Sequence, residues 1–188
     1  KCITGLYNDK NIFIGKGAGR NATSGGGNIY MGECAGQYHC GSGNFAAGFH
    51  AFAGGSGTGT DNIVFGQESG YSITSGSKNI SMGFQTLYSM DTGSYNSSFG
   101  AMAGMSVSSG SYNTLLGYYS GSNLTTGHAN VAIGCDVSFA SATGSCQLAI
   151  GVGNTVWLRG DSNFNIYDKD GNKLGFLEDA YGNLAAGT

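Results

Sequence analysis

Hydrophobic and polar residues recur along this chain with a fixed period. The group Asn-x-x-x-Gly returns at a constant interval from Asn62 to Asn130, and slightly uneven intervals extend the series back to Asn11. When the asparagine is counted as position 0, position +3 is apolar in every copy and position +1 in most copies. A constant period, here about 17 residues, is typical of stacked structural units, each of which is one short supersecondary element.

The alternation after each asparagine predicts a short strand with one buried face. The pattern therefore indicates an all-β fold, a β-solenoid of nine rungs of about 17 residues, in which stacking buries what one rung cannot bury alone. Each rung is expected to contain this strand, a glycine corner, a second extended segment and a second glycine corner. We expect a continuous buried column at position +3, formed by Phe65, Met82, Phe99, Leu116 and Ile133. Side chains at position +2, such as Ser98, are then expected to face outward.

Two columns of the repeat carry specific expectations. Stacked side-chain amides can hydrogen-bond along a β-stack, and the Gln in the last copy favours such a ladder over a simple turn preference of Asn. The ladder residues are Asn11, Asn28, Asn44, Asn62, Asn79, Asn96, Asn113, Asn130 and Gln147. Position +4 is always glycine, which suits a tight corner with a positive φ or no space for a Cβ. These corner glycines are Gly15, Gly32, Gly48, Gly66, Gly83, Gly100, Gly117, Gly134 and Gly151.

The pattern divides the chain into four segments. Residues 11–151 form the repeat rod, and residues 1–10 are expected to be an N-terminal edge or junction. In residues 152–176 the repeat is lost, and Asp170-Gly171 between two alternating runs indicates a hairpin, so we expect a C-terminal cap there. Residues 177–188 are a terminal extension. A chain that begins at Lys1 is compatible with a processed protein or with a piece of a longer one.

Composition limits the class of protein. The chain has 188 residues with 36 glycines, no proline, 10% charged residues and a net charge of -3, which excludes collagen and opposes disorder. No apolar run approaches the ~20 residues of a membrane helix, so we expect no membrane insertion. The weak acidic balance indicates no nucleic-acid partner. Because each rung has few core positions and the rod little charge, we expect self-association as a homotrimer, with a single-chain solenoid as the alternative.

Three segments carry a resemblance to known fibres. Asn-Ile-Phe-Ile-Gly-Lys-Gly-Ala-Gly at residues 11–19, Asn-Ser-Ser-Phe-Gly-Ala-Met-Ala-Gly at residues 96–104 and Asn-Val-Ala-Ile-Gly at residues 130–134 resemble repeats of bacteriophage tail-fibre shafts. They also resemble the head repeats of trimeric autotransporter adhesins, whose repeats are shorter than those of this chain. The resemblance implies an extracellular, trimeric, non-enzymatic fibre used for attachment. It transfers no binding residue to this chain.

Candidate chemistry is sparse in this sequence. Asp168-x-Asp170-x-Asn172 is similar to the start of a calcium loop, but Lys173 stands where such a loop needs glycine, so a plain hairpin turn is preferred. The histidines His39, His50 and His128 occupy unrelated repeat positions. We therefore predict no catalytic residues, no metal site and no cofactor.

The tyrosines are the candidate surface-binding residues. Tyr71 and Tyr88 share one repeat position and Tyr95 and Tyr112 share another, so each pair is expected to stack on successive rungs. Such ladders can contact a cell-surface glycan or receptor, or pack between rungs or subunits.

The chain contains five cysteines: Cys2, Cys34, Cys40, Cys135 and Cys146. They are either buried free thiols or disulfides. A bridge between Cys135 and Cys146 would close most of one rung, and Cys2 is left over for pairing between chains.

The sequence thus predicts a structural fibre or adhesin-like shaft for extracellular reach and attachment. One alternative is a subunit of an extracellular filament joined end to end through its termini by strand addition. Another is an ice- or sugar-binding solenoid, for which only one column of exposed Ser and Thr residues argues.

Overall fold

The computed structural model describes residues 10–163, 165–174, 176–178 and 184–186. Most of the predicted N-terminal edge (1–10) and of the terminal extension (177–188) lies outside these residues, as does Cys2. The described part contains strands and turns and no helix, which confirms the predicted all-β class.

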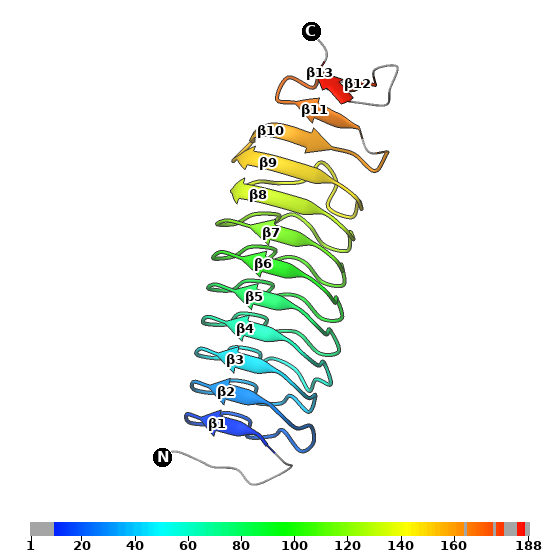
Figure 1. The fold of residues 1–188 in the computed structure, drawn as a ribbon. Helices are drawn as coiled ribbons and strands as arrows, with labels where there is room; N and C mark the ends of the chain where they lie inside the picture. The colour runs from blue at the N-terminus through cyan, green and yellow to red at the C-terminus, as the bar shows by residue number, and fades with distance from the viewer. Residues whose placement is uncertain (1–9, 164, 175, 179–183, 187–188) are drawn as a thin grey trace.

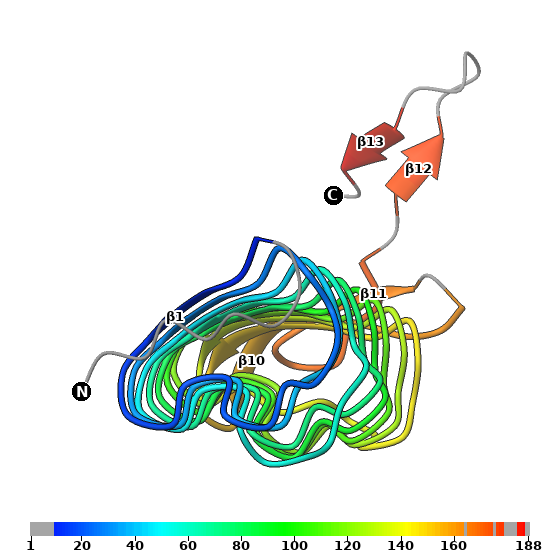
Figure 2. The same cartoon turned by 90° about the horizontal axis from the view of Figure 1, so that it is seen from below.

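Nine parallel strands, one per repeat, form a rod of about eight turns (Figure 1). The strands are β1 (Ile12–Ile14), β2 (Ile29–Met31), β3 (Phe45–Ala47), β4 (Ile63–Phe65), β5 (Ile80–Met82), β6 (Ser97–Phe99), β7 (Thr114–Leu116), β8 (Val131–Cys135) and β9 (Leu148–Val152). Equivalent repeat positions pair across every step, for example Ile63 with Ile80 and Ile80 with Ser97. Viewed along the rod, the rungs lie nearly on top of one another (Figure 2). The predicted β-solenoid and its register are thus confirmed.

The second extended segment is absent from the described rungs, which is a correction to the prediction. Residues after each corner glycine form turns because positions +6 and +8 adopt the left-handed conformation, as Met102 (φ 57°) and Gly104 (φ 59°) do. Left-handed residues interrupt an extended strand. The turns still bond to the next rung, since the Gly104 amide donates to the Ser120 carbonyl at 2.9 Å. Each rung therefore has one sheet side and a turn-built remainder.

The strands face the opposite way to the prediction. Position +2 points into the rod, where Val64, Ser98 and Leu115 are fully buried. The expected core column at position +3 is instead on the outer side of the sheet: Met82 and Leu116 are exposed, and Phe65, Phe99 and Ile133 are half-buried. The alternation was predicted correctly, but both sides of the strand are apolar. In five of the nine rungs the inner side chain is smaller than its outer neighbour, as Ser98 is beside Phe99, whereas in the second rung the large Tyr30 fills the interior.

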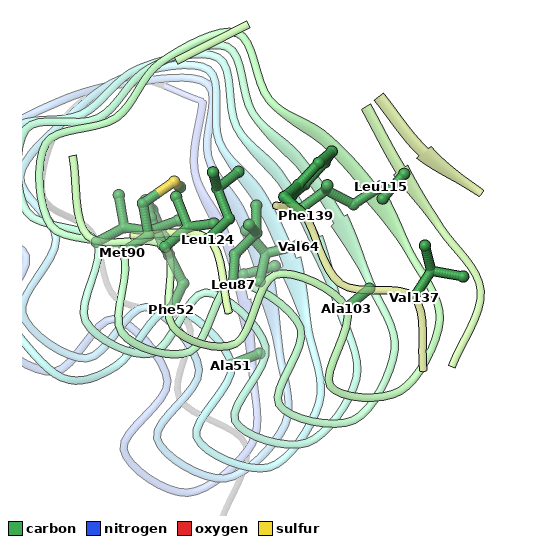
Figure 3. Close-up of a cluster of buried hydrophobic side chains, with 14 of the residues drawn as sticks. Ala51, Phe52, Val64, Leu87, Met90, Ala103, Leu115, Leu124, Val137 and Phe139 are labelled. Carbon is green, nitrogen blue, oxygen red and sulfur yellow. The ribbon is translucent and has the colours of Figure 1, made fainter. Parts of the chain in front are cut away.

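The core is filled by size matching between positions +2 and +8. Where position +2 is large, position +8 is glycine, because a Cβ there would meet the inner ring or branch, as for Gly36 against Tyr30 at 2.4 Å. Where position +2 is small, position +8 can be large, as in the pair Ala46 with Phe52. In the sixth rung both positions are small, and leucines of the adjoining rungs extend toward Gly104 instead. Position +11 completes the core with the residues Ile73, Met90, Val107 and Leu124. Met90 and Leu124 are labelled in Figure 3.

The chain reverses direction after the ninth rung. Strand β10 (Thr155–Gly160) runs antiparallel to β9, with an irregularity between Val156 and Leu158, and β11 (Ile166–Asp168) pairs with β10. A further antiparallel pair is formed by β12 (Phe176–Glu178) and β13 (Leu184–Ala186). The edge of β9 that would pair with another rung is therefore occupied by β10 (Figure 1).

The corner glycines yield the first prediction. At Gly100 φ is +130°, and a Cβ would lie 2.5 Å from the Gly117 carbonyl oxygen of the next rung. We expect Gly100→Ala to lower the free energy of unfolding by about 3 kcal/mol or more, since both the backbone and the stacking contact are strained. Urea unfolding followed by circular dichroism measures this.

Gly153 provides the matched control, because it also has a positive φ (+55°) but no atom within 4 Å of an added Cβ. Gly153→Ala is expected to cost only about 1 kcal/mol for its left-handed backbone. Equal losses in the two variants would contradict close stacking at the corner.

Candidate interaction face

The outer side of the sheet is an apolar surface that runs the length of the rod. We call it the apolar face and define it by positions +1, +3 and +5 of the rungs. At +1 and +3 the only residues that are not apolar are Ser97 and Thr114, and none is charged. Ile12 is 50% exposed, Ile14 48% and Leu116 47%, although these are large aliphatic side chains.

Position +5 widens the apolar face on its C-terminal side. Phe49, Phe84, Tyr118 and Val152 are exposed there. The charged residues of this column are Lys16 and Glu33, and they neutralise each other at 3.2 Å. Beyond the ninth rung Trp157 is 56% exposed at the irregularity in β10. With ~4.8 Å between strands and ~3.3 Å per residue, the face measures about 38 Å by 13 Å, comparable to the largest apolar patches that monomers expose.

The asparagine column forms a continuous ladder of hydrogen bonds inside the rod. The Asn79 side-chain oxygen accepts from both the backbone N–H and the side-chain amide of Asn96, at 2.9 and 3.1 Å. The Asn96 amide also donates to the Gly110 carbonyl at 2.9 Å, which ties the start of the rung to its second glycine corner. Equivalent inter-rung side-chain bonds run from Asn28 to Asn130, and Gln147 adds a longer one at 3.4 Å. Asn11 joins through its oxygen, which accepts from the Asn28 backbone N–H.

A second ladder lies two residues before the asparagines, and the sequence interpretation missed it. The hydroxyl oxygens of Ser77, Ser94 and Ser111 each accept a backbone N–H from the rung before, at 2.9 to 3.1 Å. In the next rung His128 occupies this position, and its Nδ1 atom accepts from the Ser111 N–H at 3.0 Å. The recurrence of serine at this position was the available signal. The ladder gives His128 a structural partner.

The tyrosine pairs stack as predicted. The rings of Tyr95 and Tyr112 are 4.9 Å apart and nearly parallel, and those of Tyr71 and Tyr88 are 5.3 Å apart. Lys78 lies over the Tyr95 ring at 5.2 Å. One face of the Tyr95 ring is covered by Tyr112 and the other by Lys78. A sugar that stacks on a tyrosine needs one of these ring faces to be free. This geometry makes the interior of the stack a poor sugar platform.

One buried cluster of polar groups has no hydrogen-bond partner among the described residues. His39 is fully buried and stacks on Phe52 at 3.4 Å, and both of its ring nitrogens are unsatisfied in that part of the chain. The Tyr30 ring also packs against Phe52, and its buried hydroxyl has no hydrogen-bond partner among the described residues either. Burial lowers the pKa of His39 to about 4, and the nearby Ile73 carbonyl opposes this shift in part. Burial raises the pKa of Tyr30, so both side chains are neutral at pH 7.

The acidic turn at residues 168–172, near the C-terminal end, is held by its own hydrogen bonds. The Asp168 carboxylate accepts from the backbone N–H groups of Asp170 and Asn172 and from the Asn172 side-chain amide. These bonds lower the pKa of Asp168, with the Asn172 side chain as the main cause. In the described residues no three His, Cys, Asp or Glu side chains gather in a way that could hold a metal ion.

The four described cysteines, Cys34, Cys40, Cys135 and Cys146, are free thiols. The strand register rules out the suggested bridge between Cys135 and Cys146. Cys135 pairs with Val152 at one end of the β8–β9 pair, whereas Cys146 lies just before Leu148 at the other end. Their Cα atoms are thus separated by about 15 Å or more, and a disulfide needs about 7 Å or less.

Comparison with known protein families, curated proteins and solved structures finds no match to this chain. In the described residues no helix has the length and apolar character needed to cross a membrane. Function must therefore be inferred from the geometry of the chain itself.

The asparagine ladder yields the second prediction. In Asn96→Asp the side chain loses the two donors that face the Asn79 oxygen and the Gly110 carbonyl, and a buried carboxylate meets two oxygens. We expect a loss of about 3 kcal/mol or more in unfolding free energy at pH 7, and a smaller loss at pH 4, where the acid is protonated. Denaturant unfolding at the two pH values measures both. Asn21→Asp, at an exposed site outside the ladder, is the control and should change stability little.

His39 yields the third prediction. Its pKa is lowered in the folded chain, so unfolding takes up a proton at acid pH. The stability that depends on the neutral ring is fully present above pH 6.5 and is lost as the pH falls toward 4, by about 3 kcal/mol. We expect His39→Phe to remove this slope in unfolding experiments between pH 7 and pH 4. His128→Ser, which restores the residue found at that position in neighbouring rungs, should leave the slope unchanged. A slope that persists in His39→Phe would refute the assignment.

Proposed function

We propose that this chain is a non-enzymatic structural protein, a shaft segment of an extracellular fibre in which three copies pack through their apolar faces. The observation that carries the proposal is the apolar face itself. Its columns +1 and +3 consist mostly of large apolar side chains, which the rod leaves either exposed or half-buried. Apolar patches of this size on a monomer are often functional, and larger ones mark interaction sites.

The partner that fits this surface best is another copy of the same chain. The face is long, straight, nearly uncharged and repetitive along the rod, so it matches a surface with the same rung spacing. A closed cyclic arrangement hides all such faces around one axis and leaves none exposed. Each rung has one flat side, and three flat sides meet around an axis as a triangular prism. The resemblance to trimeric fibre repeats agrees with this packing and supports the extracellular location and the role in attachment.

The filament that grows by strand addition is less well supported. The open edge of β9 is where a new rung would pair, and β10 and β11 occupy it. Growth through that edge would require these strands to detach. A glycan-binding role for Tyr95 and Tyr112 is also weakened, because their rings stack on each other.

The fourth prediction tests the self-association. Leu116 is exposed in the central column (+3) of the apolar face. Leu116→Glu therefore places a charge where copies are proposed to meet. Light scattering after size-exclusion chromatography should give about three times the 19.1 kDa chain mass for the unmodified protein. The variant should need at least tenfold higher concentration to assemble, because a buried unpaired charge opposes binding by more than about 1.4 kcal/mol.

Ser109→Glu is the matched control, since Ser109 is exposed and lies outside the strands. It should assemble like the unmodified protein. A stable species of one chain mass at all concentrations, with an intact β-type spectrum, would overturn the proposed packing. If both variants weakened assembly equally, the apolar face would not be the contact surface.

A further inference from the structure

We propose that the first two rungs of the rod, residues 11–43, separate from the third rung at acid pH, because the closed core cannot accommodate a protonated His39. The rod then has an acid-sensitive end, while the rungs from residue 44 onward stay stacked. The inference does not depend on the proposed function, since it concerns the interior of a single chain. It goes beyond the pH dependence of global stability predicted above, because it assigns the change to one interface between rungs.

His39 occupies a core position that later rungs fill with apolar side chains. It stands at position +11 of the second rung and is fully buried. Its ring stacks on Phe52 of the third rung, with 3.4 Å between the ring centroids. The equivalent residues of later rungs are Ile73, Met90, Val107 and Leu124. A side chain that can bind a proton therefore lies at the contact between the second and third rungs.

The groups packed around the His39 ring provide no counter-charge. From the third rung the ring meets Phe52 and the backbone of Gly57, where an added Cβ would collide with it. From the fourth rung the Ile73 carbonyl lies nearby, but it offsets the effect of burial on the pKa only in part. In the second rung the buried hydroxyl of Tyr30 is neutral at pH 7 and below.

The charged side chains of the first four rungs lie elsewhere. Glu33 pairs with Lys16 at the surface, Arg20 and Asp61 are exposed, and Glu68 is hydrogen-bonded to the fifth rung. The pKa of His39 is shifted by burial and by a backbone carbonyl, and no charged side chain contributes to the shift. A proton on His39 therefore adds a charge to the core that nothing on the facing elements compensates.

Protonation of His39 favours the separated state. The neutral ring has one N–H donor and the charged ring has two, and neither ring nitrogen has a hydrogen-bond partner among the described residues. When the second rung leaves Phe52, water reaches the ring, and the pKa of His39 returns from about 4 to its ordinary value of 6.5. By proton linkage, the equilibrium constant for separation rises about 100-fold between pH 7 and pH 4.

The position of His39 near one end of the rod keeps this change local. In a stack of repeats each unit contacts its neighbours, so releasing the terminal units breaks a single interface. The first rung contributes little to the core, namely Ala18 and the partly buried Phe13. The interface that breaks is held by bonds such as the one from the Ile29 N–H to the Asn44 carbonyl, at 2.9 Å. Exchange of such amides with solvent reports the separation.

Hydrogen exchange followed by mass spectrometry on the full chain tests the inference. Labelling is done at pH 7 and at pH 4, with times scaled to the intrinsic exchange rate at each pH. Peptides that cover residues 29–36 include the Ile29 and Gly36 amides, which donate to the third rung. For these amides we expect the opening constant to rise about 100-fold at pH 4. Peptides that cover residues 97–121 should change little.

Two variants remove the proton-binding group. His39→Leu introduces the side chain found at position +11 of the seventh rung, and His39→Phe keeps a flat ring against Phe52. Both should abolish the rise. The matched control is His50→Asn, because His50 lies in the third rung, is partly exposed and stacks on the exposed Phe49. Asparagine tolerates the left-handed backbone at this position (φ 53°), so this variant should keep the rise.

Each outcome decides the inference. A rise in the first two rungs that both His39 variants lose and His50→Asn keeps would support it. The absence of a rise, or a rise that the His39 variants retain, would refute it. An equal rise in residues 97–121 would show that the whole rod unfolds together, which also refutes it. If neither His39 variant folds, this core position does not accept an apolar side chain, and the inference loses its basis.

Discussion

The amide of the asparagine at position 0 is the interaction on which the rest of the rod depends. Its oxygen accepts two donors from the next rung, and its nitrogen donates to the previous asparagine and to the second glycine corner of its own rung, as in Asn96. Aspartate lacks the donors and serine lacks the reach, so only a side-chain amide can make all four bonds. Gln147 keeps the inter-rung bond, but its longer side chain also donates to the Ser141 and Gly144 carbonyls. The series ends there, in the rung after which the chain reverses.

The hydrogen bond from the asparagine amide to the second glycine corner has a geometric consequence for the core. Because the asparagine bonds across to the second corner, each rung closes into a narrow loop around the side chains at position +2. The loop has little room for a second large group, which explains why Tyr30 requires Gly36 and why Phe52 requires Ala46. The remaining large apolar side chains of the strand have no space inside and are placed on the apolar face. The ladder and the exposed surface are therefore two results of one constraint.

The same constraint explains which features could be read from the sequence. The period, the strands and the asparagine column follow from the recurrence of Asn and from alternation, and these were predicted. The direction of the strands was not, because hydrophobicity alone cannot choose between Val64 and Phe65 when both are apolar. The reciprocal sizes of Ser81 and Leu87 were the overlooked signal. The turns were also missed, since left-handed residues such as Leu87 (φ 49°) and Met102 (φ 57°) carry no glycine signature. The apolar face became apparent only from the structure, in which the position +3 residues expected in the core lie on the outer side of the sheet.

The large apolar side chains on the outer side of the strands also link the stability of the fold to association between copies. In most domains the largest side chains stabilise the monomer. Here Leu116 is exposed and Phe99 and Ile133 are half-buried, so they bury the rest of their surface only if another copy covers them. Under the proposed packing, burial of these side chains stabilises the folded chain only when copies associate. The apparent free energy of unfolding should therefore rise with protein concentration. The interior ladders then need only hold each rung in shape, and the apolar face supplies the stability of the assembled rod. A repeat that carries many large apolar side chains on the outer side of its strands is thus suited to the proposed fibre, in which neighbouring copies cover these side chains.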